Sequence, residues 1–285
     1  MIRRLTIVGV GLLGGSVAKA ARARGVSKEI VGVGRDAGRL DVARRDGTFD
    51  HVTTDLAAGV RDADVVVLAA PVLAILGLLE AVAKVAGPET IVTDVGSTKR
   101  AIVAAADGLA RVHPWRFVGS HPMAGSEQSG YAHARVDLFH GATVIVTPGE
   151  ASEPAAVKTI VALWEALGAG RVVTLAPDAH DRAVAAISHL PHLAAFALVD
   201  AVERFEPGAF DVAARGFRDT TRIAAADPTM STMESIAPTS WNSTCSGETP
   251  CNFPSTRARS AKAFCARSAA RAGKAARAIK SRISR

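Results

Sequence analysis

A histidine, three serines and a glutamate lie within twelve residues, in the segment Gly119-Ser-His-Pro-Met-Ala-Gly-Ser-Glu-Gln-Ser-Gly130. The three glycines of this segment favour a loop over a helix or strand. A loop can present the His121 imidazole together with hydroxyls and the Glu127 carboxylate to a small polar ligand. A neutral imidazole, with a reference pKa of about 6.5, is suited to act as a general base. We therefore expect an active-site loop here.

A glycine fingerprint near the start of the chain predicts dinucleotide binding. Gly9, Gly11 and Gly14 have the spacing G-x-G-x-x-G, after an apolar run at 2–8 and before a helical pattern. The first glycine allows a tight turn, the second lets the backbone approach a pyrophosphate, and the third lets helix and strand pack closely. The helix N-terminus then faces the phosphate charge. The predicted cofactor site also includes the two residues inside the fingerprint, Leu12 and Leu13.

The residues after the second apolar run, 29–33, bear on the choice between NAD and NADP. An NAD-selective site usually has a carboxylate directly after this strand, whereas an arginine can receive a 2′-phosphate. Position 34 is glycine, Arg35 follows, and Asp36 comes one or two residues late. The sequence therefore favours NADP and makes Gly34 and Arg35 candidate cofactor residues. NAD, with Arg35 as a solvated loop charge, stays open.

Strand-like and helical patterns alternate along the first half of the chain. This alternation predicts an α/β fold with a parallel sheet covered by helices on both faces. Ala70 and Pro71, and further along Ser97, lie just past strand ends, where ligands bind in such sheets. The strand-like runs are 63–69, 90–94, 116–119, 142–147 and 172–175, and clear helical patterns cover 72–85 and 98–109.

Downstream, the alanine-rich segment 180–205 has a helical apolar period and contains Ser188-His-Leu-Pro-His192. Pro191 would interrupt or kink that helix. His189 and His192, three residues apart, lie close to one face. Core packing and a binding site are both open for this pair. A lone histidine in an apolar helix is more often a satisfied core residue, and we interpret two others in this way, His113 and His180.

A further helix is predicted to open at Gly216-Phe-Arg-Asp-Thr-Thr-Arg-Ile-Ala224. Asp219 or Thr220 could cap it. Arg222 would then lie in the first turn, where the helix macrodipole disfavours a cation. Arg222 therefore either points to water or is held for an anionic ligand.

Five motifs in this order resemble the prephenate/arogenate dehydrogenases of tyrosine biosynthesis, and the match runs from residue 1 to about 230. By resemblance, the fold is a Rossmann-type parallel-sheet domain followed by an all-α domain that forms a homodimer. The implied reaction is the oxidative decarboxylation of prephenate or arogenate with NAD or NADP. The motifs are 9–16, Asp94-Val-Gly-Ser-Thr-Lys99, 119–130, 188–192 and 216–224.

The resemblance also implies roles for individual residues. His121 would draw the proton from the substrate hydroxyl as hydride leaves, and Ser97 would help to hold the same hydroxyl. Arg222 would pair with a substrate carboxylate, as a planar fork matches a planar anion. The remaining candidates are Ser126, His189 and His192 for the polar side arm, Glu127 as a gating or sensing carboxylate, and Asp219 to orient its neighbours. No residue decides between prephenate and arogenate.

Two other readings compete with this one. The first is another two-domain dehydrogenase, of the β-hydroxyacid or 6-phosphogluconate kind. Those enzymes usually rely on a catalytic lysine, and the His121 segment argues against them. The second is a non-catalytic dinucleotide- or nucleic-acid-binding protein that uses basic residues near the C-terminus. No His/Cys cluster has the spacing of metal ligands, so we expect no metal site.

Charge and composition divide the chain near residue 230. The net charge is +7, but residues 231–285 hold ten of the 34 Lys/Arg and two of the 27 acids, which leaves 1–230 with a net charge of −1. All three cysteines lie in the same tail, at irregular spacing. We predict a dinucleotide-binding domain at 1–176, the start of a helical substrate and dimerisation domain at 177–230, and an atypical basic tail at 231–285. The abrupt shift suggests either a change of coding frame or a lineage-specific tail.

No signal peptide is visible in the sequence, and no run of about 18 apolar residues occurs in it. We expect a cytoplasmic protein with a small-molecule substrate, no membrane association and no nucleic-acid partner.

Overall fold

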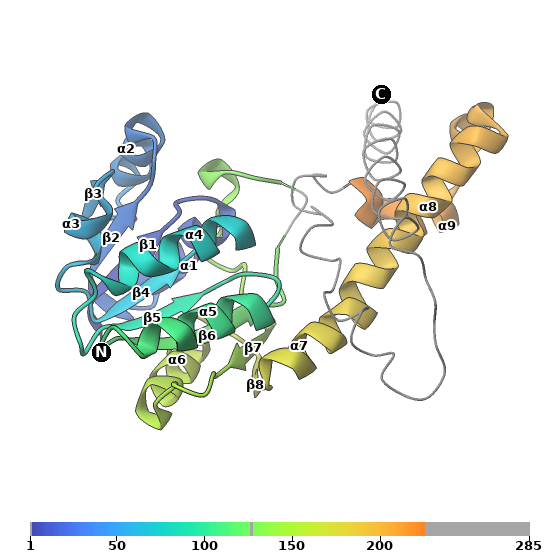
Figure 1. Ribbon diagram of the computed structural model, residues 1–285. Coiled ribbons are helices and arrows are strands. Elements are labelled where there is room, and N and C mark those ends of the chain that lie inside the picture. The colour runs from blue at the N-terminus through green and yellow to red at the C-terminus, as the bar shows by residue number, and fades with distance from the viewer. Residues whose placement is uncertain (1, 126–127, 226–285) are drawn as a thin grey trace, which may run out of the picture. The chain divides into compact units, whose positions relative to one another are not determined.

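The computed structural model describes residues 2–125 and 128–225 (Figure 1). The chain divides into two compact units, Met1–Arg182 and a second that begins at Ala183. Our expectations for Ser126, for Glu127 and for the tail at 231–285 lie outside the described residues. The domain boundary that we place between 176 and 177 stays a prediction.

The first unit is built on one eight-stranded sheet with the strand order β3-β2-β1-β4-β5-β6-β7-β8. Apolar runs form its central strands, and residues of these runs are buried on both faces, as a helix-covered parallel sheet requires. The strands are β1 Ile2–Val8, β2 Ser27–Val33, β3 His51–Thr53, β4 Val65–Leu68, β5 Ile91–Asp94, β6 Arg116–Pro122, β7 Thr143–Thr147 and β8 Arg171–Thr174. The predicted α/β class is confirmed.

One strand pair departs from the parallel sheet that the sequence predicts. β6 and β7 are antiparallel, with Gly119 opposite Thr147 and Pro122 opposite Val144. The predicted strand at 116–119 is confirmed, but it continues to Pro122, so our expectation of a loop is wrong for the three residues 120–122. Gly119 serves close strand approach rather than a turn, because a Cβ there would lie 2.4 Å from Oγ1 of Thr147.

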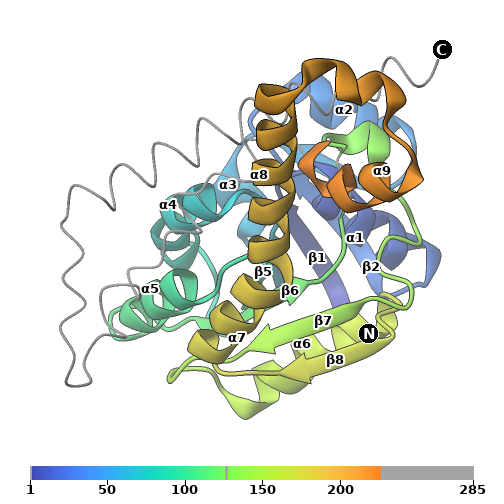
Figure 2. The same cartoon turned by 90° about the vertical axis from the view of Figure 1, so that its right-hand side faces the viewer.

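Helices cover both faces of the sheet. Residues of α1, α2 and α6 pack in one apolar cluster and those of α3, α4 and α5 in the other. Figure 2 shows the second set together on one side of the sheet. The helices of the first unit are α1 Leu12–Ala23, α2 Ala37–Arg45, α3 Leu56–Val60, α4 Val72–Ala83, α5 Arg100–Ala110 and α6 Pro154–Ala166, and α7 Pro177–Val184 begins there. Because the helices cover both faces of the sheet, the ends of the strands are the part of the sheet that they leave uncovered.

The segment Tyr131–His133 and the following Ala134, which we call the strap, lie against α1. The Tyr131 hydroxyl donates to Asp46 Oδ2 at 2.5 Å and lies 2.9 Å from Oγ1 of Thr48. Burial raises the pKa of Tyr131, and the Asp46 carboxylate raises it further, so the phenol stays a donor. A Cβ on Gly15 would lie 2.7 Å from the Tyr131 ring. The fourth glycine of the Gly9–Gly15 region is therefore needed by the strap.

In the second unit, a π-helical turn at Ala185–His189 leads into α8, Leu190–Phe205. The interruption that we predict around Pro191 is confirmed as this π-turn, which is a common response to a proline inside a helix. Residues of α8 pack with α9, Arg215–Thr221, and its neighbours in a small core of Ala195, Phe196, Val199 and Ala224.

The helical run Pro177–Phe205 is long and apolar enough to cross a membrane by length and composition, with a mean hydropathy of 1.4 in its most apolar stretch. The sequence predicts the helical segment 180–205, but we did not expect it to be apolar enough to cross a membrane, because charged and polar residues interrupt its apolar stretch. Helices that pack inside soluble proteins pass the same test, so the finding is weak evidence for a membrane span.

Candidate functional site

The carboxyl ends of four neighbouring strands bring the first group of predicted residues to one edge of the sheet. β1, β4, β5 and β6 are adjacent and all four run parallel, so the residues at and after their carboxyl ends share that edge. The strand order reverses between β1 and β4, which is where ligands bind in such sheets. The edge carries the glycine turn after β1, Ala70 and Pro71 after β4, exposed Ser97 after β5, and His121 near the end of β6.

The glycine turn has the shape of a phosphate cradle. A Cβ on Gly9 would lie 2.3 Å from the Ala69 carbonyl oxygen, and one on Gly14 would lie 2.1 Å from the Gly9 carbonyl oxygen. Both glycines are therefore required by protein packing. A Cβ on Gly11 would meet nothing within 4 Å, so the space beside Gly11 is open to a ligand. Leu12 is buried in the core and Leu13 is half-buried.

The turn after β2 carries the predicted specificity residues. Arg35 is exposed and Gly34 is half-buried. The Asp36 carboxylate caps α2 by accepting from the Arg39 amide at 3.1 Å, and it lies 3.6 Å from the Arg39 guanidinium. A hollow beside this turn is lined by Ala37, Leu40, Asp41, Val52, Thr53 and Thr54.

His121 is nearly buried and belongs to a chain of hydrogen bonds. Its Nδ1 lies 2.9 Å from Nε2 of His180, whose Nδ1 lies 2.8 Å from Oδ1 of Asp181. His180 is fully buried. We predicted His180 only as a core histidine, and this contact is the part of the site that sequence reasoning missed. The one signal was the adjacent pair His180-Asp181 at the start of a helix.

A second buried network holds the strand residue before His121. The Lys99 ammonium donates to the Asp94 carboxylate and, at 2.9 Å, to the Ser120 carbonyl. Asp94 also accepts from the Ser120 amide at 3.2 Å, and the Ser120 hydroxyl donates to the Asp94 carbonyl at 2.6 Å. Burial lowers the pKa of Lys99, and the neighbouring carboxylates Asp94 and Asp181 oppose that shift. The network fixes the backbone from which the His121 side chain projects.

The second unit presents its candidate residues differently from our expectation. Asp219 lies inside α9, 3.4 Å from Arg215, and the N-terminal cap of α9 is Ala214, so the predicted cap at Asp219 or Thr220 is wrong. Arg222 is exposed at the C-terminal end of α9, where the macrodipole favours a cation, and not in a first turn. α9 begins at Arg215, four residues before Asp219, so Asp219 lies inside the helix and not at its N-terminus.

The two histidines around Pro191 are both half-buried. His192 donates from Nδ1 to the Ser188 carbonyl at 2.8 Å, because a carbonyl can only accept. This bond places the lone pair of a neutral His192 on Nε2. His192 can therefore accept a hydrogen bond from a ligand through Nε2.

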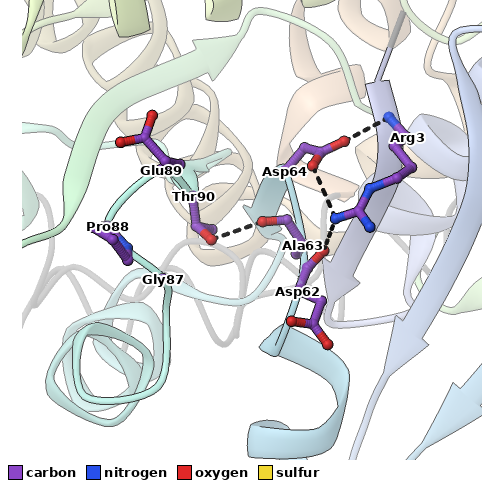
Figure 3. Close-up of a pocket in the computed structure, with 8 residues that line it drawn as sticks. All are labelled: Arg3, Asp62, Ala63, Asp64, Gly87, Pro88, Glu89 and Thr90. Carbon is purple, nitrogen blue, oxygen red and sulfur yellow. Dashed lines mark hydrogen bonds and ion pairs between the residues drawn. The ribbon is translucent and has the colours of Figure 1, made fainter.

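A hollow at the opposite edge of the sheet is lined by residues whose hydrogen bonds join neighbouring strands. Figure 3 shows Arg3 against Asp64, with its amide donating to Oδ2 at 2.6 Å and its guanidinium to the Asp62 carbonyl at 3.1 Å. Thr90 donates to the Ala63 carbonyl at 2.7 Å. These bonds tie β1, β4 and the segment before β5 together at their amino ends.

Within residues 2–125 and 128–225, no group of three or more His, Cys, Asp and Glu side chains is arranged to hold a metal ion.

Comparisons with known proteins identify the family. Residues 17–174 match the family model "Prephenate dehydrogenase, nucleotide-binding domain", and residues 176–238 match "Prephenate dehydrogenase, dimerization domain". The chain is 37% identical to a prephenate dehydrogenase of Bacillus subtilis over 230 residues, which are 79% of this chain and 62% of that protein. The chain thus spans less than two thirds of the length of that relative.

Solved structures agree with these matches. A prephenate dehydrogenase of Aquifex aeolicus, in complex with hydroxyphenyl propionate and NAD+, superposes with a TM-score of 0.75 at 32% identity, covering 83% of this chain and 84% of the other. An arogenate dehydrogenase of Synechocystis gives a TM-score of 0.70 at 34% identity, covering 82% and 83%. With one family model matching more than half of its length, this chain belongs to the prephenate dehydrogenase family.

Proposed function

We propose that this chain oxidises prephenate or arogenate, with loss of CO2, to 4-hydroxyphenylpyruvate or tyrosine. The observation that carries the proposal is the position of His121, a nearly buried imidazole on a strand at the same sheet edge as the glycine turn. The resemblance to proteins of both named activities, over 79% to 83% of the chain, supports it.

His121 performs the proton chemistry in this proposal. It accepts the proton of the substrate ring hydroxyl as the carbon–oxygen double bond forms, and Ser97 helps to hold that hydroxyl. A bound nicotinamide cofactor supplies the hydride acceptor. The carboxylate on the opposite ring carbon leaves as CO2, and its bonding electrons complete the aromatic ring. The gain of aromaticity makes the reaction effectively irreversible.

Residues of the second unit and of the segment after His121 would recognise the substrate. Arg222 pairs with a substrate carboxylate, since its exposed guanidinium can form a bidentate contact. His192 accepts a hydrogen bond from the side arm through Nε2. The proposed set also includes His189, Ser126, Glu127 and Asp219, with Glu127 as a gating carboxylate and Asp219 orienting its neighbours.

We also propose NADP as the preferred cofactor. The open space beside Gly11 fits a pyrophosphate, so the turn fits either dinucleotide. The only nearby acid in the β2–α2 turn, Asp36, is engaged in capping α2 and in pairing with Arg39. Exposed Arg35 is therefore better placed to receive a 2′-phosphate than Asp36 is to receive a ribose hydroxyl. An Arg35→Ser variant that keeps its NADP+ preference would contradict this assignment.

We propose further that the chain acts as a cytoplasmic homodimer. In the described part of the second unit, 183–225, four large apolar side chains are more than half exposed, at Ile187, Leu190, Phe205 and Val212. Exposed apolar surface of this kind commonly marks an interface. The match to a dimerization domain supports the homodimer. Light scattering of the purified chain tests the dimer.

The test of function is NAD(P)H formation, followed by absorbance, with prephenate or arogenate and each cofactor. We expect turnover with at least one substrate. His121→Asn should lower kcat by a factor on the order of 10² to 10⁴. His113→Asn is the matched control, because His113 lies outside the site on the segment before β6. Turnover in His121→Asn equal to that of His113→Asn would refute the role of His121.

A further inference from the structure

The mechanism above gives no role to the group that contacts His121 Nδ1. That partner is Nε2 of His180, 2.9 Å away, and the two rings meet edge to face at a centroid distance of 5.1 Å. His180 projects from α7, and its ring is fully buried, so water does not compete for the contact. A histidine ring nitrogen is either donor or acceptor, and the identity of the donor here decides which nitrogen of His121 carries the lone pair.

Asp181, at the far end of this chain of hydrogen bonds, determines which histidine donates in the His121–His180 contact. Asp181 accepts at Oδ1 from the Lys99 amide at 2.7 Å and from His180 Nδ1, and at Oδ2 from the Arg100 amide at 3.0 Å. The two amides belong to the N-terminus of α5, which favours a negative charge. Burial alone would raise the pKa of Asp181, but the hydrogen bonds from His180 and from the two amides outweigh it and hold the pKa below its usual range.

An ionised carboxylate can only accept hydrogen bonds. His180 Nδ1 must therefore carry its proton, which leaves Nε2 of a neutral His180 as an acceptor. His121 Nδ1 must then donate to that acceptor. The lone pair of His121 is consequently on Nε2.

We propose that His180 and Asp181 are positioning residues, which hold His121 in the tautomer whose Nε2 accepts the substrate proton. The proposal rests on the proposed function for the identity of that proton. During the reaction, the hydroxyl proton moves to His121 Nε2, and His121 keeps its Nδ1 proton donated to His180. The imidazolium that results lies one ring away from the Asp181 carboxylate, which stabilises its charge.

The nearby cation does not compete for this role. The Lys99 ammonium donates to Asp94 and to the Ser120 carbonyl, both outside the His121–Asp181 chain. Lys99 contributes to that chain through its backbone amide. The two networks therefore share a residue, but the carboxylate that faces the imidazole pair is Asp181.

The tautomer can be measured without turnover. In the full-length chain labelled with 15N-histidine, the ring nitrogen shifts report which nitrogen carries the proton, and the signal missing from His121→Asn assigns His121. We expect protonated Nδ1 and unprotonated Nε2 on His121 in the wild-type chain at neutral pH. A wild-type spectrum with the proton on Nε2 would overturn the proposal, whether or not prephenate is the substrate.

Asp181→Asn tests the link to rate. An asparagine amide can donate to His180 Nδ1, so the proton of His180 moves to Nε2 and His121 is forced to carry its proton on Nε2. We expect the His121 spectrum to switch and kcat to fall about a hundredfold or more, with KM for substrate and cofactor within about twofold of wild type. Asp178→Asn is the matched control, since Asp178 is on the same helix and lies 3.8 Å from Arg100 but does not touch His180.

The outcomes separate the proposal from the proposed function. An unchanged His121 spectrum in Asp181→Asn, or a kcat no lower than that of Asp178→Asn, contradicts the positioning role. Failure of the wild-type chain to turn over either substrate contradicts the proposed function, while the wild-type spectrum still decides the tautomer. If Asp181→Asn does not fold, as judged by its thermal melt, the wild-type spectrum remains the deciding measurement.

Discussion

Replacing Lys99 with methionine would remove the ammonium from a fully buried ion pair and keep most of the side-chain volume. Lys99 and Asp94 are both inaccessible to solvent. Asp94 would keep the amides of Gly96 at 2.8 Å and Ser120 at 3.2 Å, but its charge would lose the Lys99 cation, and the Ser120 carbonyl would lose a donor. Breaking a buried pair on one side costs about 3–5 kcal/mol. With two amides retained, we expect about 4 kcal/mol, or roughly 8 to 16 °C in Tm for a unit of this size.

Chemical denaturation followed by circular dichroism measures this cost at about pH 7.5. Adding Asp94→Asn to Lys99→Met removes the unpaired charge, so the double variant should be more stable than Lys99→Met alone. A cost below about 1 kcal/mol for Lys99→Met at pH 7.5, or a double variant that is no more stable, would refute the reasoning.

Three further predictions use the same denaturation assay. Gly15→Ala should lower the free energy of unfolding by about 1–3 kcal/mol, because its Cβ would lie 2.7 Å from the Tyr131 ring. Gly11→Ala should stay within about 1 kcal/mol of wild type and should instead weaken NAD(P)+ binding in a fluorescence titration. Equal stabilities of the two variants would contradict this prediction. Tyr131→Phe should cost about 1–2 kcal/mol by removing the donor to Asp46, and an unchanged stability would limit Tyr131 to packing. Because the pKa of Asp181 is held low, the stabilisation from its carboxylate is complete above about pH 4 and is lost as the pH falls through the lowered pKa. Asp181→Asn should therefore make the free energy of unfolding fall less steeply with pH below about pH 4. A fall as steep as that of wild type would show no such linkage.

Local patterns made the cofactor half of the site predictable. The turn at Gly9 to Gly14 follows from glycine spacing between a strand and a helix, and its place at the switch between β1 and β4 follows from the alternation of strands and helices. The π-turn before Pro191 follows from a single residue that cannot donate.

Long-range pairing made the other half unpredictable. His121 and His180 are 59 residues apart, and their contact depends on where α7 packs in the first unit. The strand at Gly119–Pro122 exists because β7 runs antiparallel to it, a choice that glycine content in the segment obscures. The start of α9 was missed because Ala214 caps it without a side-chain hydrogen bond, so the sequence contains no capping signal there.

The reversed strand β7 has a consequence for how this enzyme family could diversify. Because β7 pairs with Gly119 to Pro122, the strand β6 extends past the end of its neighbour β5 and carries His121 inside the sheet. The chain leaves the sheet only at Met123. His121, the proposed proton acceptor, and the segment proposed to recognise the rest of the substrate are therefore adjacent in sequence, but only His121 is held within the sheet. Under the proposed function, insertions and substitutions after Pro122 can change substrate recognition, for instance from a keto to an amino side arm, without altering the strand that carries His121.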